Sequence, residues 1–382
     1  VSQKIAILLL PTHFVKYRIK QRLPDKKYLN FTGNVFINRV LGSLKIAHSI
    51  FRFIDRRISS TDLFDHFFEK YHPDLVFATD IFSPTDVHFL LSAKKNGVKS
   101  VGLVRSWDCT TNKNLLRVIP SRIASNNTYV KEELVRLHDV KADIITPVGF
   151  SQFDAYINLK PDSREEFFDK IGADKSKRLV MFAPAGNAQS DVDYQYCEIL
   201  DKAITEGRIS GDIQFLVSKH PQDTVDLSAF ENNPHFIIEH LGVGFSNNAK
   251  ATEVDQAATR HLINYIFHSE LLISLNTSLG LDSVIFDKPH IMIGFDGYEG
   301  FKHRKYFKSI KDYQLEDNMQ GYIKTGAVRI AHDQEELVQW INKYLNDPTI
   351  DAVGREKARQ TILYKMDGKS GERIADFVLH SL

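Results

Sequence analysis

The sequence has little cysteine and little net charge, and each shortage excludes a class of protein. Its two cysteines, Cys109 and Cys197, are too few for a disulfide framework or a zinc cluster, and they favour a reducing, cytoplasmic compartment. The net charge of +1 argues against a nucleic-acid binder, which is normally more basic. Hydrophobic residues at 43% and charged residues at 25% are typical of globular proteins, and 382 residues usually make two domains.

Long apolar runs are also missing near the N-terminus. The run at residues 5–10 is too short to span a bilayer. It is followed by Pro11 and polar residues rather than by a small-residue cleavage site, which argues against a signal peptide. We therefore predict that Lys4–Leu10 forms a first buried strand.

Several familiar motifs do not occur. The sequence has no G-x-x-x-x-G-K-[ST] loop, no G-x-G-x-x-G fingerprint, no G-x-S-x-G elbow and no H-E-x-x-H. Asp191 and Asp193 form a D-x-D pair, but the pair lies at a predicted helix start, where acidic side chains favour the helix dipole. We expect no metal site and no cofactor.

Short apolar runs alternate with helical segments along the whole chain. This alternation predicts parallel sheets with helices on both faces. The predicted strands are Lys4–Leu10, Leu75–Ala78, Ser100–Val104, Ile144–Pro147, Leu179–Phe182, Ile213–Val217, Phe236–Ile238, Leu271–Ser274, His290–Ile293 and Ala327–Ile330. The predicted helices include Thr61–Tyr71, Tyr129–His138 and Glu335–Asn346.

A polar break lies between Leu159 and Lys177, where Gly172 is suited to ending a helix. We therefore expect an α/β protein with two Rossmann-like, doubly wound domains in tandem, residues 1–160 and 161–372, and a central cleft.

The segment from Ser274 to Asp282 is the strongest candidate for a binding site. It follows an apolar strand, and open α/β sheets bind ligands beyond the carboxyl ends of their strands. Asn276, Thr277 and Ser278 are side-chain donors beside a predicted helix N-terminus, which attracts phosphate. Asp282 lies one turn after Ser278, where it could hold ribose hydroxyls. Ordinary capping by Thr277 or Ser278 is the alternative.

Two further loops follow predicted strands in the second half. Lys219 and His220 form a basic pair that could meet a diphosphate, although a solvated turn would also explain them. Gly186 would allow the backbone to approach a phosphate or sugar closely, with Asn187 beside it.

In the first half, His13, Asp80 and Asp108 follow predicted strands. The loops that carry them should open at one edge of the sheet, so all three are candidate general bases. Each is also a common kind of cap or turn residue.

The N-terminal region mixes basic and apolar residues, as in Arg52, Arg56 and Arg57 among Ile50, Phe51, Phe53 and Ile54. Such a segment can lie on an anionic membrane surface, but a solvated helix face is the more common explanation. A further basic cluster contains Lys16, Arg18, Lys20, Arg22, Lys26 and Lys27.

The motifs together resemble a known group of transferases. The two-domain plan is similar to the GT-B fold, and the second half resembles the CDP-glycerol glycerophosphotransferase and surface-polysaccharide transferase group. The matching pieces are Lys219-His220-Pro221, Thr277-Ser278 with Asp282, Lys288-Pro289, Asp367–Ile374, Ser106–Thr111, where Cys109 replaces an expected Asn, and Gly149–Asp154. The resemblance implies an acceptor-binding first domain, a donor-binding second domain and a last helix, 373–382, that packs back on the first.

From this resemblance we expect an inverting, metal-independent glycosyltransferase of bacterial surface-polysaccharide synthesis. It would move a sugar from a nucleotide-sugar donor to a glycan or lipid-linked acceptor. Peripheral contact with the inner membrane surface is a further possibility. We expect no nucleic-acid partner. Lys219 and His220 would neutralise the leaving phosphate, and Asp80, His13 or Asp108 would take the acceptor proton. The alternatives are a CDP-glycerol-type glycerophosphotransferase, a sugar-nucleotide 2-epimerase and a non-catalytic nucleotide-binding protein.

Overall fold

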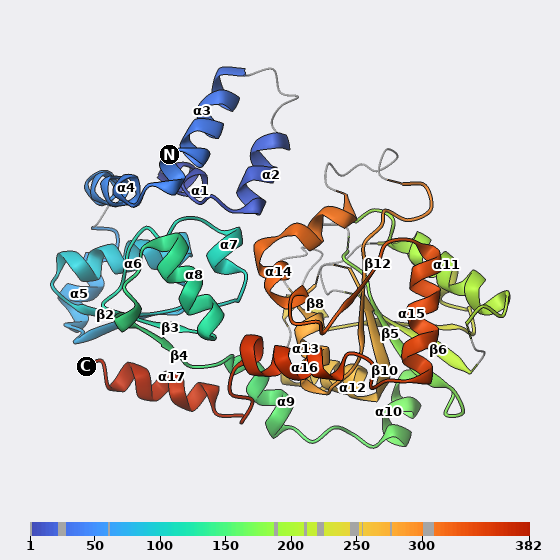
Figure 1. Cartoon of the computed structure of the whole chain (residues 1–382). Coiled ribbons are helices and arrows are strands. Elements are labelled where there is room, and N and C mark those ends of the chain that lie inside the picture. Colours follow the sequence, from blue (N-terminus) through green and yellow to red (C-terminus); the bar gives the residue numbers. More distant parts are fainter. Residues whose placement is uncertain are drawn as a thin grey trace. The chain divides into compact units, whose positions relative to one another are not determined.

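The computed structural model describes residues 2–21, 28–59, 62–186, 190–209, 212–219, 225–244, 252–253, 255–275, 277–300 and 309–382. The chain divides into two compact units, coloured along the sequence in Figure 1. Unit 1 comprises residues 1–154, 316–318 and 361–382, and unit 2 comprises residues 155–315 and 319–360.

Unit 1 is built on a sheet of four parallel strands in the order β1-β2-β3-β4. The strands are β1 (Leu75–Ala78), β2 (Lys99–Leu103), β3 (Arg122–Ser125) and β4 (Ile145–Pro147). The helical elements are α1 (Ser2–Leu8), α2 (His13–Gln21), α3 (Tyr28–Arg39), η2 (Leu41–Ser43), α4 (Lys45–Ile58), α5 (Asp65–Tyr71), α6 (Pro84–Lys95), α7 (Cys109–Asn112), α8 (Thr128–His138), η3 (Ala142–Ile144), η4 (Ser151–Phe153) and α17 (Ser370–Leu379).

The C-terminal helix α17 covers one face of this sheet (Figure 1). Phe377 of α17 packs with Val101 of β2, Ala124 of β3 and Val148 in one buried cluster. Helix α6 contacts β1 and β2, and α8 contacts β3 and β4. The first sheet is therefore covered in part by a helix that lies far after its strands in the sequence.

Unit 2 is built on six parallel strands in the order β12-β11-β10-β5-β6-β7. The strands are β5 (Arg178–Ala183), β6 (Ile213–Lys219), β7 (Phe236–His240), β10 (Ser269–Ser274), β11 (His290–Ile293) and β12 (Arg329–Ala331), and β8 (Val243–Gly244) with β9 (Thr252–Glu253) forms a separate antiparallel pair. The helical elements are α9 (Asp154–Asn158), α10 (Arg164–Ile171), α11 (Asp193–Thr205), η5 (Ser228–Phe230), α12 (Gln256–His268), α13 (Leu279–Ile285), η7 (Ile310–Leu315), α14 (Asp317–Ile323), α15 (Gln334–Asn346), α16 (Ala352–Ala358) and η8 (Arg359–Leu363), with α9, α14 and η8 crossing unit boundaries.

Both faces of this second sheet are buried. Val180 and Phe182 of β5 belong to a core cluster with residues of α11 and α15, such as Tyr196 and Ile341. The alternate residue Met181 is fully buried as well, and α12 contacts β5 and β10. Burial on both sides explains why these strands carry apolar side chains without alternation. The predicted α/β class with two Rossmann-like sheets is confirmed.

One predicted strand is wrong. Residues 4–10 were expected to pair in a sheet, but Ser2–Leu8 forms helix α1. Ala6, Leu9 and Leu10 are buried, whereas Lys4 and Ile5 are exposed, so the segment buries a single stripe. An apolar run this short does not show enough hydrophobic periodicity to distinguish a strand from a half-buried helix.

Two other differences concern short elements. Strand β3 was not predicted, because two of its four residues, Arg122 and Ser125, are polar and Ile123 is its one large apolar side chain. The helix predicted over 61–71 begins at Asp65 in the structure.

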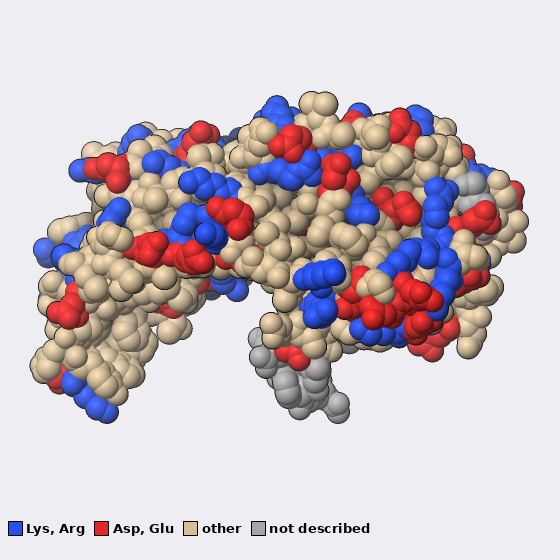
Figure 2. Space-filling view, turned by 90° about the horizontal axis from the view of Figure 1, so that it is seen from below, with Lys and Arg blue, Asp and Glu red and all other residues tan. Residues whose placement is uncertain are grey.

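Among the described residues, no helix has the length and apolar character needed to cross a bilayer. Acidic and basic side chains are interspersed over the face shown in Figure 2.

Candidate functional site

The order of strands in unit 2 identifies one edge of its sheet as the place for a ligand. From β5 the chain adds β6 and β7 on one side, and then β10, β11 and β12 on the other. The reversal lies between β5 and β10, whose last residues Ala183 and Ser274 are paired. Ligands of open α/β sheets bind beyond the carboxyl ends of the strands at such a reversal. The predicted loops after Ala183 and Ser274 are therefore neighbours.

In the described part of the loop after β10, the Thr277 side chain bonds to the start of the following helix. Thr277 Oγ1 accepts a hydrogen bond from the backbone N–H of Leu279 at 3.2 Å, close to the start of α13. Ser278, the residue before α13, is exposed and makes no capping bond with its side chain. The predicted helix after the strand is present, with seven residues. The hydroxyl of Ser278 therefore faces solvent and does not cap the helix.

A buried hydrogen-bonded chain runs from β10 to α13. Ser274 Oγ lies 2.8 Å from His290 Nε2, and His290 Nδ1 lies 3.1 Å from the hydroxyl of Tyr322. Tyr322 also donates to the carbonyl oxygen of Gly280 at 2.9 Å. Burial lowers the pKa of His290 to about 3, so the ring is neutral and each nitrogen has one role. The side chain of Ser274 therefore points into the protein interior and does not face a ligand.

Asp282 of α13 is buried as well. Its Oδ1 accepts a hydrogen bond from the hydroxyl of Tyr156, at the start of unit 2. Burial raises the pKa of Asp282 to about 6, although the bond from Tyr156 opposes the shift. A ribose could reach this carboxylate only if Tyr156 gave up its bond.

The loop after β5 folds against α11. Gly186 has a left-handed backbone with φ of 74°. Its N–H donates to Oδ2 of the buried Asp193 at 2.9 Å, and its carbonyl accepts from Ser190 at 2.8 Å. Asp193 is the acidic first-turn residue predicted for this helix, and the structure adds that it anchors the neighbouring loop.

Lys219 ends β6, which lies beside β5 in the sheet. Its side chain is mostly buried, and Nζ donates to the carbonyl of Val225 at 2.5 Å. A buried ammonium needs partners, and a carbonyl supplies one without neutralising the charge. The positive charge of Lys219 is thus held at the carboxyl edge of the sheet.

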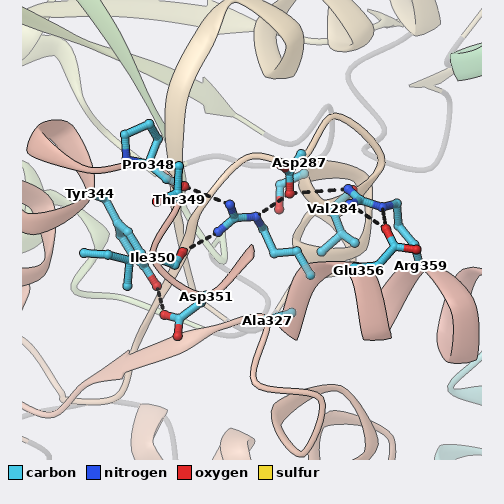
Figure 3. Close-up of polar contacts among 12 residues, drawn as sticks. Val284, Asp287, Ala327, Tyr344, Pro348, Thr349, Ile350, Asp351, Glu356 and Arg359 are labelled. Atoms are coloured by element: carbon cyan, nitrogen blue, oxygen red, sulfur yellow. Dashed lines mark hydrogen bonds and ion pairs between the residues drawn. The ribbon is translucent and has the colours of Figure 1, made fainter. Parts of the chain in front are cut away.

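The far end of α13 is clamped by two arginines of α16 and its extension (Figure 3). The buried Arg355 donates through Nε to Asp287 Oδ1 at 2.7 Å, and its two terminal nitrogens donate to backbone carbonyls of residues 348 and 350. Arg359 donates to the carbonyl of Val284 at 2.9 Å. These bonds fix the position of α13, and with it the loop that precedes the helix.

In unit 1, two of the three candidate bases lie after β1 and β2. Asp80 forms an ion pair with Arg105, Oδ2 to Nε, at 3.1 Å, so the loops after the two strands meet as predicted. Asp108 precedes α7 and accepts with its backbone carbonyl from Thr111 and Asn112.

His13 does not follow a strand, because the predicted strand before it is a helix. It begins α2, and its backbone N–H donates to Asp317 Oδ2 at 2.7 Å. The preceding Thr12 donates to the carbonyl of Thr111 at 2.8 Å, which places the start of α2 beside α7. His13 and Asp108 thus lie on neighbouring segments because α2 begins beside α7, and not because both residues follow strands of one sheet.

A buried polar group that the sequence did not reveal lies beneath these loops. Glu133 of α8 accepts a hydrogen bond from Thr110 of α7 and is almost fully buried. Burial raises the pKa of Glu133 to about 7, against the opposing effect of Thr110. His138 accepts at Nδ1 from the N–H of Leu116 and donates from Nε2 to the carbonyl of Thr110, and burial lowers its pKa to about 3.

Three predicted site residues, Asn187, His220 and Asn276, lie outside the described residues. Within the described part of the chain, no group of three or more His, Cys, Asp or Glu side chains could hold a metal ion. The residues that sequence reasoning missed are His290, Tyr322, Tyr156, Asp193 as a loop anchor, and Glu133. His290 is the one polar residue of an otherwise apolar strand that follows Pro289. This position was the sequence feature that could have indicated a buried histidine.

Comparison with solved structures shows proteins of the same fold. The S. aureus MnaA–UDP co-structure has a TM-score of 0.55 and 13% identity, covering 88% of this chain and 82% of that one. The UDP-GlcNAc 2-epimerase from Methanocaldococcus jannaschii has a TM-score of 0.52 and 17% identity, covering 88% and 83%. The UDP-GlcNAc 2-epimerase from Neisseria meningitidis bound to UDP-GlcNAc has a TM-score of 0.55 and 10% identity, covering 90% and 84%. Identities this low show a common fold alone.

Comparison with protein families is more specific. A search of curated proteins finds no match to the chain. Residues 104–380 match the family described as CDP-Glycerol:Poly(glycerophosphate) glycerophosphotransferase, and this match confirms the resemblance that the motifs predicted. Because the match spans well over half of the sequence, the chain belongs to the CDP-glycerol:poly(glycerophosphate) glycerophosphotransferase family.

Proposed function

We propose that this chain transfers glycerol phosphate from CDP-glycerol to a hydroxyl group of a poly(glycerophosphate) or lipid-linked acceptor. The observation that carries the proposal is the family match over residues 104–380. The Rossmann strand order of unit 2 supports it, because the reversal between β5 and β10 suits a nucleotide.

In the proposed reaction, an acceptor oxygen attacks the phosphorus that carries glycerol. A new oxygen–phosphorus bond forms, the pyrophosphate bond breaks and CMP leaves with the electron pair. The proton of the acceptor hydroxyl passes to a base of unit 1, for which Asp80, Asp108 and His13 remain the candidates.

The donor phosphates would lie beyond the ends of β5, β6 and β10. Ser278 would donate a hydrogen bond there, and the charge of Lys219 would favour an anion. His220 remains a candidate for the leaving phosphate, and Gly186 for close backbone approach. Catalysis without a metal ion is part of this prediction.

Inverting glycosyl transfer from a nucleotide sugar is the second candidate. It is favoured by the fold shared with the S. aureus MnaA structure, which contains UDP. An acceptor oxygen would then attack the anomeric carbon, and a nucleoside diphosphate would leave. The two reactions differ in the leaving group, and this difference makes them separable.

The test is a donor screen with the purified chain, in which released nucleotide is measured with and without acceptor. We expect release of CMP from CDP-glycerol when acceptor is present, and we expect a chelator to leave this release unchanged. UDP released from a UDP-sugar in the presence of acceptor would favour glycosyl transfer, and isomerisation of UDP-GlcNAc without release of UDP would favour epimerisation. Binding of CDP-glycerol without turnover would contradict an enzymatic role, and loss of activity with chelator would contradict metal independence.

Ser278→Ala tests the proposed phosphate site. Its side chain makes no capping bond, so stability should change by less than about 0.5 kcal/mol. Turnover should fall by about 10² to 10³, the usual cost of one donor to a developing negative charge. The exposed Ser176→Ala, whose hydroxyl donates to Asp174, is the control for turnover. Unchanged turnover in Ser278→Ala would remove this residue from the mechanism.

A further inference from the structure

Strand β1 forms one edge of the sheet of unit 1. In the order β1-β2-β3-β4 its neighbour is β2, with a parallel register from Leu75 to Ala78. Among the described residues, no strand pairs with the other side of β1. The backbone N–H and C=O groups on that side form a row of donors and acceptors, which is a template for a further strand.

This edge has little protection against such pairing. Edge strands are commonly guarded by lysine, by proline, by a bulge or by being short. The sequence of β1 contains no charge and no proline, and its pairing with β2 has no register shift. Pro73 precedes the strand and removes none of its N–H groups. The guard that is present is the length of four residues.

An apolar hollow lies along the same edge. Its volume is about 360 Å³, and it is lined by residues of β1, α5 and α6. Phe68 of α5 packs with Val76 of β1 in a buried cluster, which holds α5 beside the strand. The ring centres of Phe67 of α5 and Phe89 of α6 lie 5.8 Å apart in the lining. The hollow can therefore receive apolar side chains next to the open backbone of β1.

Exposed apolar side chains stand beside this hollow. Phe67 and Tyr71 lie one turn apart on α5 with their ring centres 6.2 Å apart, and they are 38% and 62% exposed. Phe77 of β1 is 37% exposed. We call these three side chains and the outer backbone of β1 the β1 edge surface. Apolar groups that gather on a surface in this way mark an interaction site.

The backbone of β1 selects a polypeptide as the occupant. A lipid tail or another apolar molecule would fill the hollow, but it would cover the N–H and C=O groups of the edge without bonding to them, which costs free energy. A further strand bonds to these groups and also carries side chains into the hollow.

A second copy of this chain supplies everything that the surface needs. Two β1 strands can pair antiparallel about a twofold axis, and each copy then contributes an open edge, a hollow and the exposed side chain of Tyr71. The net charge of +1 gives little repulsion between copies.

We propose that two copies of this chain associate through the β1 edge surface, with their β1 strands antiparallel. The two sheets of unit 1 would become one continuous sheet, and Phe67 and Tyr71 of each copy would cover the hollow of the other. This association is independent of the donor and of the reaction.

The test combines sedimentation equilibrium of the full chain with amide hydrogen exchange at low and high protein concentration. We expect a monomer–dimer equilibrium, and we expect exchange in β1 to slow at high concentration because a new strand protects its amides. Strand β4 is the other edge of the same sheet, and its exchange should not depend on concentration.

Two substitutions test the surface itself. Phe77→Lys places a charge on the open edge and should raise the dissociation constant of the dimer at least about tenfold. Tyr71→Ser removes an aromatic contact and should raise it by about tenfold. The matched controls in unit 2 are Val353→Lys and Tyr298→Ser, at residues that are 85% and 50% exposed. Both should dimerise like the unchanged chain, and circular dichroism should show that all variants are folded.

A chain that stays monomeric at every concentration overturns the proposal. A dimer that Tyr71→Ser leaves unchanged, or in which β1 gains no protection, overturns it as well, even if Phe77→Lys does not fold. Protection of β1 in a monomeric chain by a synthetic peptide of alternating valine and threonine would assign the edge to a foreign strand instead of a second copy.

Discussion

At the scale of single residues, burial decides the ionisation of Glu133. Its carboxylate accepts a hydrogen bond from Thr110, and the nearby charges of Arg136 and Asp317 shift its pKa in opposite directions. The pKa of Glu133 rises from an ordinary 4.5 to about 7 because the charged form loses its hydration. The folded chain therefore holds this proton over a range in which the unfolded chain has released it.

This shift predicts a pH-dependent stability. Between pH 4.5 and 7 the folded state binds more protons than the unfolded state, so the free energy of unfolding falls as the pH rises. Glu133→Gln cannot ionise, so its stability relative to the unchanged chain should increase over this range, by up to about 3 kcal/mol. Urea unfolding at several pH values measures the difference.

The exposed Glu165→Gln, whose side chain is 80% exposed, is the control and should show no such trend. A stability difference for Glu133→Gln that stays constant with pH would show that Glu133 is ionised in the folded chain.

Asp282 makes a second point at the residue scale. The sequence places it one turn after Ser278, and that spacing suggested a ribose ligand. Its contact with Tyr156 comes from a residue far away in the sequence. Calorimetry of CDP-glycerol binding to Asp282→Asn tests the ribose role, and an unchanged affinity would leave Asp282 a purely structural residue.

At the scale of elements, α13 depends on close contact with β11. A Cβ added at Gly280 would lie 2.5 Å from Cε1 and 2.8 Å from Nδ1 of His290. The His290 ring cannot move freely, because Ser274 and Tyr322 hold its two nitrogens. We predict that Gly280→Ala destabilises the chain by about 1–3 kcal/mol, as measured by chemical unfolding.

Gly33→Ala is the matched control for this substitution. Gly33 lies in helix α3, and a Cβ there meets nothing within 4 Å. Alanine should be neutral or stabilising by up to about 1 kcal/mol at that position. Equal effects of the two substitutions would mean that α13 tolerates displacement from His290.

The elements also show where local pattern was sufficient. Strands β1 and β11 have the predicted bounds, and the other strands of both sheets, apart from β3, begin and end within a few residues of their predicted positions. Long buried strands between turns carry a strong signal. The strand prediction for Lys4–Leu10 was wrong because a short apolar run does not specify what it packs against. Strand β3 was missed because the polar residues Arg122 and Ser125 interrupt its apolar pattern.

At the scale of the whole molecule, the last helix stabilises the first sheet. Phe377 of α17 is 7% exposed and packs on strands β2 and β3. Arg373 strengthens the attachment by donating to the carbonyl of Val148 at 2.7 Å. Segments far apart in the sequence thus pack into one layer.

We predict that Phe377→Ala destabilises unit 1 by about 3–5 kcal/mol, because it removes a buried ring from this layer. Amide hydrogen exchange should accelerate in β2 and β3 and stay unchanged in β5 and β6. Leu379→Ala, on the same helix but 61% exposed, should change exchange in neither sheet. Accelerated exchange in β5 and β6 as well would show that the two units unfold together.

The amino-acid sequence alone determined the α/β class, most of the strands, and the polar loops after β5, β6 and β10, because local periodicity and turn residues act over a few neighbouring positions. Only the tertiary structure decided which side chains face inward. It put His290 against Ser274, Tyr156 against Asp282, and the charged side of α4 against Arg117 and Asp139. The physical reason is that burial and ionisation depend on partners distant in the chain, and no local pattern names them.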